Sequence, residues 1–367
     1  MKNILLITPP FTQLNTPYPA TAYLKGFLNT KDISSFQMDL GIEVILELFS
    51  KNGLENLFQV SSFKFEEFGE NAQRIFSLQQ DYIKTIDNVI AFLQGKNPTL
   101  ARQICSGNFL PEASRFDAYN NDPDASGWAF GSMGMQDKAK HLATLYLEDL
   151  SDFIVECVDE NFGFSRYAER LGRSANSFDE MYSHLQNDLT YIDKITLQIL
   201  EERLKSVNPK LVCISVPFPG NLYSAFRCAQ FIKKHFSEIK VSMGGGFPNT
   251  ELREVKDKRV FEFFDFITLD DGELPVELLN SFCHSDEGRS SSSEFKRTFL
   301  LENNEVVYKN NTIRHDYKQV EVGTPDYSDL LLDKYISVIE IANPMHSLWS
   351  DGRWNKLTMA HGCYWGK

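Results

Sequence analysis

Several features of membrane and secreted proteins are missing from this sequence of 367 residues. It has no apolar run near the roughly 20 residues that a membrane-spanning helix needs. Its N-terminus, MKNILLITPP, has too short an apolar stretch for a signal peptide and lacks a small-residue cleavage site. The six cysteines include no close pair, so we interpret them as reduced thiols and expect a cytoplasmic protein without a membrane partner: Cys105, Cys157, Cys213, Cys228, Cys283 and Cys363.

Clustered positive charge and paired histidines are also missing. The formal net charge is -13 and Lys and Arg form no visible patch, so a nucleic-acid partner is not expected. None of the seven histidines has the paired spacing typical of a zinc site. No Gly-Lys-Ser/Thr sequence is present for a P-loop, and the glycines do not match the dinucleotide-binding fingerprint. These absences exclude several common nucleotide and metal sites.

The most informative stretch is residues 210–279, where short apolar runs alternate with segments of helical spacing. This alternation is typical of a parallel sheet with crossover helices. With two earlier runs, the sequence predicts an α/β fold with a flavodoxin-like (Rossmann-type) five-stranded parallel sheet: residues 3–8, 35–39, 211–216, 240–243 and 266–269. The alternative is a four-stranded sheet in which residues 35–39 form a loop.

The segments outside this sheet have other patterns. Between the second and third strands, apolar residues recur every three or four positions, which predicts a large helical insertion. After residue 283 a polar linker precedes a predicted hairpin of residues 297–301 and 305–308. We therefore expect an α/β ligand-binding domain in two pieces, the insertion, a connecting segment with the hairpin, and the start of a further domain: residues 1–39 with 206–283, 40–205, 284–355 and 356–367.

Polar and glycine-rich loops follow three of the predicted strands. Ligands of parallel α/β sheets bind beyond the carboxyl ends of the strands, so these loops predict a pocket. Ser215 offers a hydroxyl at a strand end, although such a serine also caps local backbone. Residues 244–246 are three glycines, which allow close approach to a ligand or form a tight turn. Residues 270–273 supply carboxylates that act as acid and base or, more commonly, cap a helix.

In combination, several motifs resemble those of cobalamin-binding radical S-adenosylmethionine proteins. The matching pieces extend over nearly the whole chain: TPPFTQLNTPYPATAYL, SVPFPGNLYSA, MGGGFPNTEL, DFITLDDGELPVELL, PDYSDLLLDKY and HGCYWGK. The resemblance implies a cobalamin-binding domain with the corrinoid over the strand ends. The cofactor-binding residues that it implies are Thr8, Pro9, Pro10, Asn15, Ser215, Pro217, Gly220, Asn221, Gly244, Gly245, Gly246, Asp271, Gly272 and Glu273.

The terminal HGCYWGK looks like the opening of the radical S-adenosylmethionine cluster loop. In that superfamily three cysteines of one short loop bind a 4Fe-4S cluster, whose fourth iron binds S-adenosylmethionine. Only Cys363 matches here, so the other two cysteines and the following partial TIM barrel would lie beyond Lys367. The resemblance thus implies a fragment of a cobalamin-dependent enzyme that reductively cleaves S-adenosylmethionine. Its substrate is unknown, and methyl transfer is one reaction to consider.

One departure from that family concerns the cobalt ligand. Many cobalamin domains supply a histidine from an Asp-x-His-x-x-Gly motif after the first strand. The corresponding loop here contains Pro9, Pro10, Thr12, Gln13 and Asn15 but no histidine. Either cobalt is held without a histidine or the domain has lost cobalamin. A non-catalytic ligand-binding module and a scaffold with an empty pocket therefore stay open as alternatives.

Overall fold

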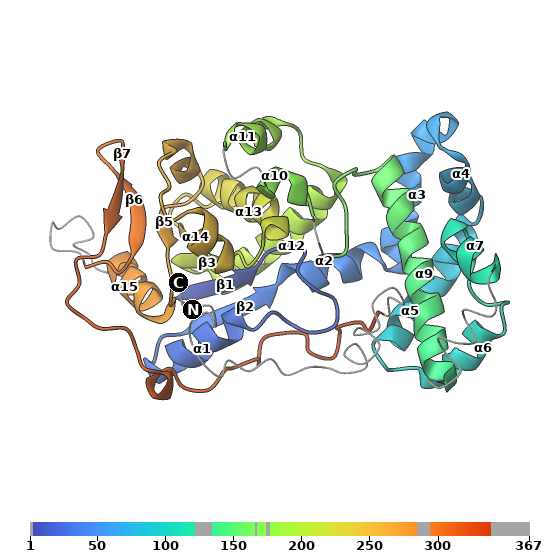
Figure 1. Ribbon diagram of the computed structural model, residues 1–367, viewed down its shortest axis with the longest axis horizontal. Helices are drawn as coiled ribbons and strands as arrows, with labels where there is room; N and C mark the ends of the chain where they lie inside the picture. The colour runs from blue at the N-terminus through green and yellow to red at the C-terminus, as the bar shows by residue number, and fades with distance from the viewer. Residues whose placement is uncertain (1–2, 122–133, 166, 174–176, 285–293, 339–367) are drawn as a thin grey trace.

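The computed structural model has an α/β fold built on one mixed sheet of seven strands (Figure 1). It describes residues 3–121, 134–165, 167–173, 177–284 and 294–338. The strand order is β2-β1-β3-β4-β5-β6-β7. The strands are β1 (Ile4–Thr8), β2 (Ser35–Asp39), β3 (Leu211–Ser215), β4 (Lys240–Gly244), β5 (Phe266–Thr268), β6 (Thr298–Glu302) and β7 (Glu305–Lys309).

All five strands predicted from the apolar runs are confirmed, and they pair in parallel. Residues 35–39 form β2 in register with β1, so the alternative of a loop there is wrong. The expectation of a purely parallel five-stranded sheet was incomplete. The hairpin extends the sheet because β6 pairs antiparallel with β5, where Ile267 lies opposite Phe299. The result is a mixed sheet in which β6 runs antiparallel to both of its neighbours, β5 and β7.

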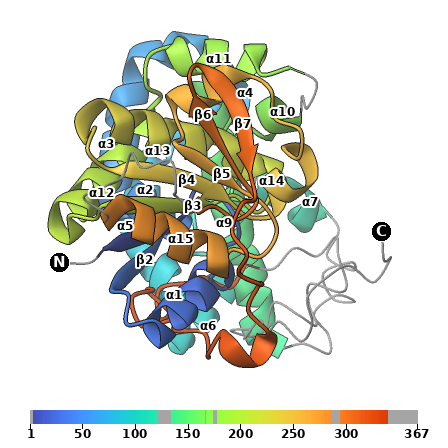
Figure 2. The same cartoon turned by 90° about the vertical axis from the view of Figure 1, so that its left-hand side faces the viewer.

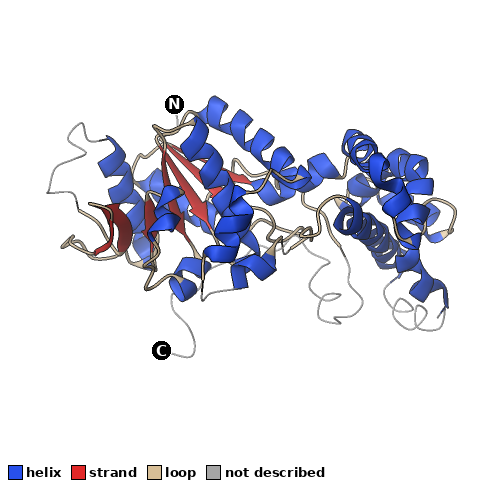
Figure 3. Ribbon diagram, turned by 90° about the horizontal axis from the view of Figure 1, so that it is seen from above, coloured by secondary structure: helices blue, strands red, loops and turns tan. Residues whose placement is uncertain are grey.

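Alternate side chains of the buried strands point to two helical layers, as the pleat of a strand requires. One face, with Leu5 and Ile7, packs under α2 (Leu40–Leu48), α12 (Tyr191–Val207) and α13 (Leu222–His235). The other face, with Ile4 and Leu6, packs under α1 (Ala20–Thr30) and α15 (Glu273–His284). Figures 2 and 3 show the sheet enclosed between these layers.

The chain between β2 and β3 is predominantly helical, as the sequence predicts. Figure 1 shows part of it gathered at one end of the molecule, away from the sheet. That group comprises α3 (Lys51–Ser61), α4 (Glu70–Ser77), α5 (Gln79–Leu93), α6 (Ala101–Cys105), α7 (Ser114–Asn121) and α9 (Gly134–Cys157). Within the described ranges, no helix has the length and apolar character needed to cross a membrane.

The two ends of this helical region return to the sheet. Asp39 ends β2 and caps α2, because its Oδ1 accepts hydrogen bonds from the backbone N–H groups of Gly41 and Ile42. Thr190 and Asp193 form a capping box at the start of α12. The helices α2 and α12 pack on each other beside β1. They therefore belong to the layer that covers the sheet, whereas α3 to α9 extend beyond it.

After β7 the chain turns back along the sheet to its other edge. Residues 323–337, which we call the strap, run past α1 to β2 and on to α5 (Figure 1). The strap buries Leu330, Tyr335 and Ile336. It covers the edge of β2, where Asp329 accepts a hydrogen bond from the backbone N–H of Gln37 at 3.3 Å. An edge strand protected in this way is less available for pairing with another chain.

Candidate functional site

A cavity of about 550 Å³ lies at the carboxyl ends of β3, β4 and β5, on the face covered by α1 and α15. This volume is within the range of small-molecule sites. The described residues that line it come from α1, the strands and the loops after them: Leu6, Tyr18, Pro19, Ala20, Thr21, Tyr23, Leu24, Cys213, Ile214, Ser215, Ser242, Gly244, Gly245, Gly246, Asn249, Thr268, Asp270, Asp271, Gly272, Glu273 and Val276. Three loops distant in sequence thus converge on one space.

The cavity brings together half of the residues proposed from the sequence. These are Ser215, Gly244, Gly245, Gly246, Asp271, Gly272 and Glu273. The other half is not in its described lining: Thr8, Pro9, Pro10, Asn15, Pro217, Gly220 and Asn221. Cys363 lies outside the described residues. The loops after β3, β4 and β5 therefore make the site, and the loop after β1 contributes through its last residues, which lead into α1.

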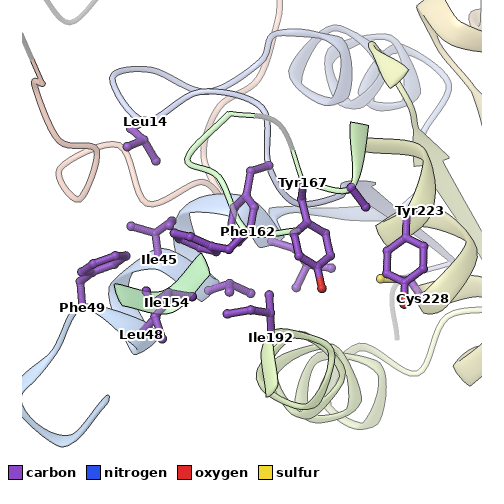
Figure 4. Close-up of a cluster of buried hydrophobic side chains, with 14 of the residues drawn as sticks. Leu14, Ile45, Leu48, Phe49, Ile154, Phe162, Tyr167, Ile192, Tyr223 and Cys228 are labelled. Carbon is purple, nitrogen blue, oxygen red and sulfur yellow. The ribbon is translucent and has the colours of Figure 1, made fainter. Parts of the chain in front are cut away.

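The loop after β1 is held mainly by internal packing. The Asn221 side chain donates hydrogen bonds to the Pro9 carbonyl and to the Thr12 hydroxyl, both at 3.0 Å. Phe11 is 1% exposed and meets Phe162 and Tyr167 edge to face, at centroid distances of 5.6 and 5.8 Å. Figure 4 shows Leu14 above this apolar cluster, and the cluster joins the loop to the helical insertion. These contacts explain why the first part of the loop does not line the cavity.

The requirement for glycine at position 245 comes from the backbone conformation and from close packing, neither of which the sequence shows. The φ of Gly245 is +105°, and a Cβ there would lie 2.7 Å from the Val216 carbonyl oxygen. The neighbouring backbone is drawn in by hydrogen bonds from Val216 N–H to Gly244 O and from Phe247 N–H to Val216 O, at 2.7 and 3.0 Å. The glycine therefore permits two loops of the chain to touch, whereas the sequence left open close approach to a ligand and a tight turn.

Three further serine and threonine residues line the cavity and were not predicted from the sequence. Ser242 and Thr268 lie in buried strands, on the same face as Ser215. The sequence does contain a signal for Ser242 and Thr268. Side chains two positions apart in a strand point to the same face, so a Ser or Thr within an apolar strand marks a face that is partly polar. Thr21 in α1 is 1% exposed, and its Oγ1 has no hydrogen-bond partner among the described residues. A buried hydroxyl without a partner beside a cavity is suited to a ligand.

Two arginines hold the acidic loop at the rim of the cavity. Arg253 pairs with Asp270, whose backbone N–H donates to the Asn249 side chain at 2.6 Å. Arg297 donates to the carbonyl oxygens of Leu269 and Asp271, each at 3.1 Å. A second pair of hydrogen bonds joins Arg297 to Asp316, and it lowers the pKa of that carboxyl. The loop is thus positioned by residues distant in sequence, which sequence reasoning did not identify.

The electrostatic character of the cavity favours a particular class of ligand. Asp270, Asp271 and Glu273 contribute carboxyl groups, while the described lining contains no Lys, Arg or His. Such a site suits a neutral or positively charged ligand with several hydrogen-bonding groups better than an anion. Burial raises the pKa of the Tyr18 hydroxyl and of the Cys213 thiol, so both stay protonated near neutral pH.

In the part of the chain that the structure describes, no group of three or more His, Cys, Asp or Glu side chains is arranged to hold a metal ion. No protein-family model, no curated protein and no solved structure matches this chain. What it does is therefore inferred from its fold, its cavity and its motifs.

Proposed function

We propose that the α/β part of this chain binds a cobalamin-type corrinoid, and that the chain is part of a cobalamin-dependent radical S-adenosylmethionine enzyme. The observation that carries the proposal is that three of the motifs on which the resemblance rests place residues in one cavity: Ser215 of SVPFPGN, residues 244–246 and 249 of MGGGFPN, and residues 268 and 270–273 of DFITLDDGE. The order β2-β1-β3-β4-β5 supports it, because flavodoxin-like sheets have this order and bind ligands beyond their strand ends.

The chemistry of the cavity is compatible with a corrinoid. The rim of a corrin ring carries neutral amide groups, which donate and accept hydrogen bonds. The cavity offers hydroxyl groups from Thr21, Ser215, Ser242 and Thr268 and the side-chain amide of Asn249. The described lining contains no histidine, so these loops would offer cobalt no histidine ligand. We assign to these five residues the task of binding and orienting the corrinoid.

The remaining parts of the proposal concern the parent enzyme. Cobalamin and S-adenosylmethionine would supply the radical and methyl-transfer chemistry, and the protein would position them. Cys363 would be one of three thiolate ligands of a 4Fe-4S cluster. The helical region between β2 and β3 would contribute structure, since many of its aromatic side chains pack on one another, as in the contacts of Phe58 with Phe76 and Phe153.

A titration with hydroxocobalamin, followed by its visible absorbance, tests the binding proposal. Ser215→Leu fills the cavity with a larger apolar side chain and should lower affinity at least about tenfold, equivalent to about 1.4 kcal/mol. The matched control is Ser206→Leu, because Ser206 is exposed on α12 and is not among the residues that line the cavity. Far-ultraviolet circular dichroism verifies that both variants fold. Unaltered binding by folded Ser215→Leu would place the ligand elsewhere.

Thr21→Val gives a second test, with effects of opposite sign on stability and binding. The change keeps the shape of the side chain and removes a buried hydroxyl that has no partner among the described residues. It should therefore raise the free energy of unfolding, by about 1 kcal/mol, because an unpaired polar group is costly to bury. It should also weaken hydroxocobalamin binding several-fold. Folded wild-type protein that fails to bind hydroxocobalamin would reject the proposal and favour the empty scaffold.

A further inference from the structure

The strap lies against one side of α1 over most of the length of the helix. The backbone N–H of Asp326 donates to the Ala22 carbonyl at 2.9 Å, and the Asn29 side chain donates to the Asp326 carboxylate at 2.8 Å. Between these contacts Gly26 leaves room for the strap, since a Cβ there would lie 2.0 Å from the Thr324 carbonyl oxygen. Residues 22, 26 and 29 share one side of a helix, so the strap follows that side.

A buried ion pair lies at the centre of this contact. Lys25 is 4% exposed, and its ammonium group pairs with the carboxylate of Asp329 in the strap. The same carboxylate accepts from the backbone N–H of Gln37 in β2. Separation of the two charges would leave the ammonium group of Lys25 buried without its partner, which is strongly unfavourable. The pair therefore ties three elements together: α1, β2 and the strap.

The opposite side of α1 is a wall of the cavity. Thr21 and Leu24 line the cavity, and Phe27 and Leu28 are buried against the sheet. Leu24 also packs close to Gly272 in the loop at the cavity rim, since a Cβ added to this glycine would lie 3.3 Å from the Leu24 side chain. The helix thus lies between the strap and the ligand space, and any shift of α1 away from the sheet would widen the cavity.

We infer that the strap sets the position of α1 as the cavity wall, and that Lys25 and Asp329 are positioning residues for the ligand site. The claim that Lys25 and Asp329 influence ligand binding rests on the proposed function. The claim that the strap sets the position of α1 does not. Beyond Asp329, Tyr335 donates to Asp39 at 2.7 Å and the backbone N–H of Ile336 donates to the Leu14 carbonyl at 2.8 Å. The strap is thereby joined at its far end to β2 and to the loop after β1.

A thiol-labelling experiment tests the position of the wall without any ligand. Cys213 lines the cavity and is 7% exposed, whereas Cys228 is buried on the other face of the sheet. Asp329→Ala should raise the rate of Cys213 labelling by N-ethylmaleimide by about tenfold or more, because an unpaired buried charge displaces the strap. Labelling of Cys228 should stay slow, which separates a local shift from global unfolding.

Two variants make the result specific. Asp333→Ala is the matched control, because Asp333 is also in the strap but pairs with Lys96 at an exposed position, 2.9 Å away. It should leave Cys213 labelling unchanged. Gly26→Ala displaces the strap without an unpaired charge and favours the helix itself, so faster labelling in this variant would come from the strap contact. It also serves if Asp329→Ala does not fold.

The double variant Lys25→Met with Asp329→Leu tests the role of the pair. Apolar side chains of similar size can replace a buried ion pair, so slow labelling should be restored. Equal labelling rates in wild type, Asp329→Ala and Gly26→Ala would overturn the inference. Hydroxocobalamin affinity then addresses the ligand part: where wild type binds, a fall of about tenfold in Asp329→Ala supports coupling, and unchanged affinity with faster labelling refutes it. Where wild type does not bind, the proposed function fails, and the labelling rates still decide the wall.

Discussion

Asp39 should make this protein less stable as the pH rises from about 4 to 6, which is opposite to the usual effect of a carboxyl group. The residue is 4% exposed at the carboxyl end of β2, where it caps α2 and accepts a hydrogen bond from Tyr335. Burial raises the pKa of its carboxyl group from 3.8 to about 6, although the hydrogen bonds from Tyr335 and the two capping amides act in the opposite direction. The perturbation that isolates this effect is Asp39→Asn.

The magnitude follows from the two pKa values. Between about pH 4 and pH 6 the folded protein keeps a proton that the unfolded chain has lost, so the free energy of unfolding falls as the pH rises through this interval. Above about pH 6 the loss is complete, and it amounts to about 3 kcal/mol at 1.36 kcal/mol for each pKa unit. Asparagine keeps an oxygen for the capping amides and carries no charge. The variant should therefore gain about 3 kcal/mol relative to wild type between about pH 4 and pH 7.

Urea unfolding of both proteins across this pH range measures the effect. The difference between the two free energies of unfolding removes the contribution of the titrating groups that do not interact with Asp39, such as buried Asp149. Asp333→Asn is the control, because Lys96 lowers the pKa of that exposed carboxyl, and its difference from wild type should stay flat or fall with pH. A difference between Asp39→Asn and wild type that does not change with pH would refute the reasoning from burial.

Two further changes test packing, one in the helical layer on the other face of the sheet and one beside the cavity. Arg227→Met should lower the free energy of unfolding by about 3–5 kcal/mol in urea titrations, because Asp193 would remain buried without its partner at 3.0 Å; a loss below about 1 kcal/mol would contradict this. Gly245→Ala should cost more than Gly107→Ala in the same assay, by at least about 1 kcal/mol, since both have positive φ but only Gly245 places its Cβ against Val216. Equal losses would show that the contact is unimportant.

The sheet could be predicted well because its strands have strong local patterns. Apart from β2, whose sequence is SFQMD, the parallel strands are short and mostly apolar runs, and a buried strand of this kind can be recognised without information from distant residues. Residues 211–216 and 240–243 differ from β3 and β4 only at their carboxyl ends. The pairing of β6 with β5 had no comparable signal, because a hairpin with a polar outer face is equally able to stand apart from a sheet.

The site could be predicted in part. A parallel sheet gathers the loops at the carboxyl ends of its strands, so the sequence alone predicts that Ser215, the three glycines and the acidic loop lie together, as they do in the cavity. The residues after β1 were assigned to the same site, yet Phe11 and Asn221 show that this loop is held by core packing. Thr21 was not singled out, because only the structure reveals that its hydroxyl is buried beside the cavity.

The sequence by itself determined the alternation of strand and helix, the helical character of the region between β2 and β3, and the strand ends at which the cavity forms. These properties depend on the spacing of apolar residues and on loop chemistry within short segments. Tertiary structure alone decided which distant partners meet. Lys25 and Asp329 are 304 positions apart, and Arg297 reaches the loop after β5 from the start of β6. Such pairs form because packing closes the chain around them, and no local pattern records that closure.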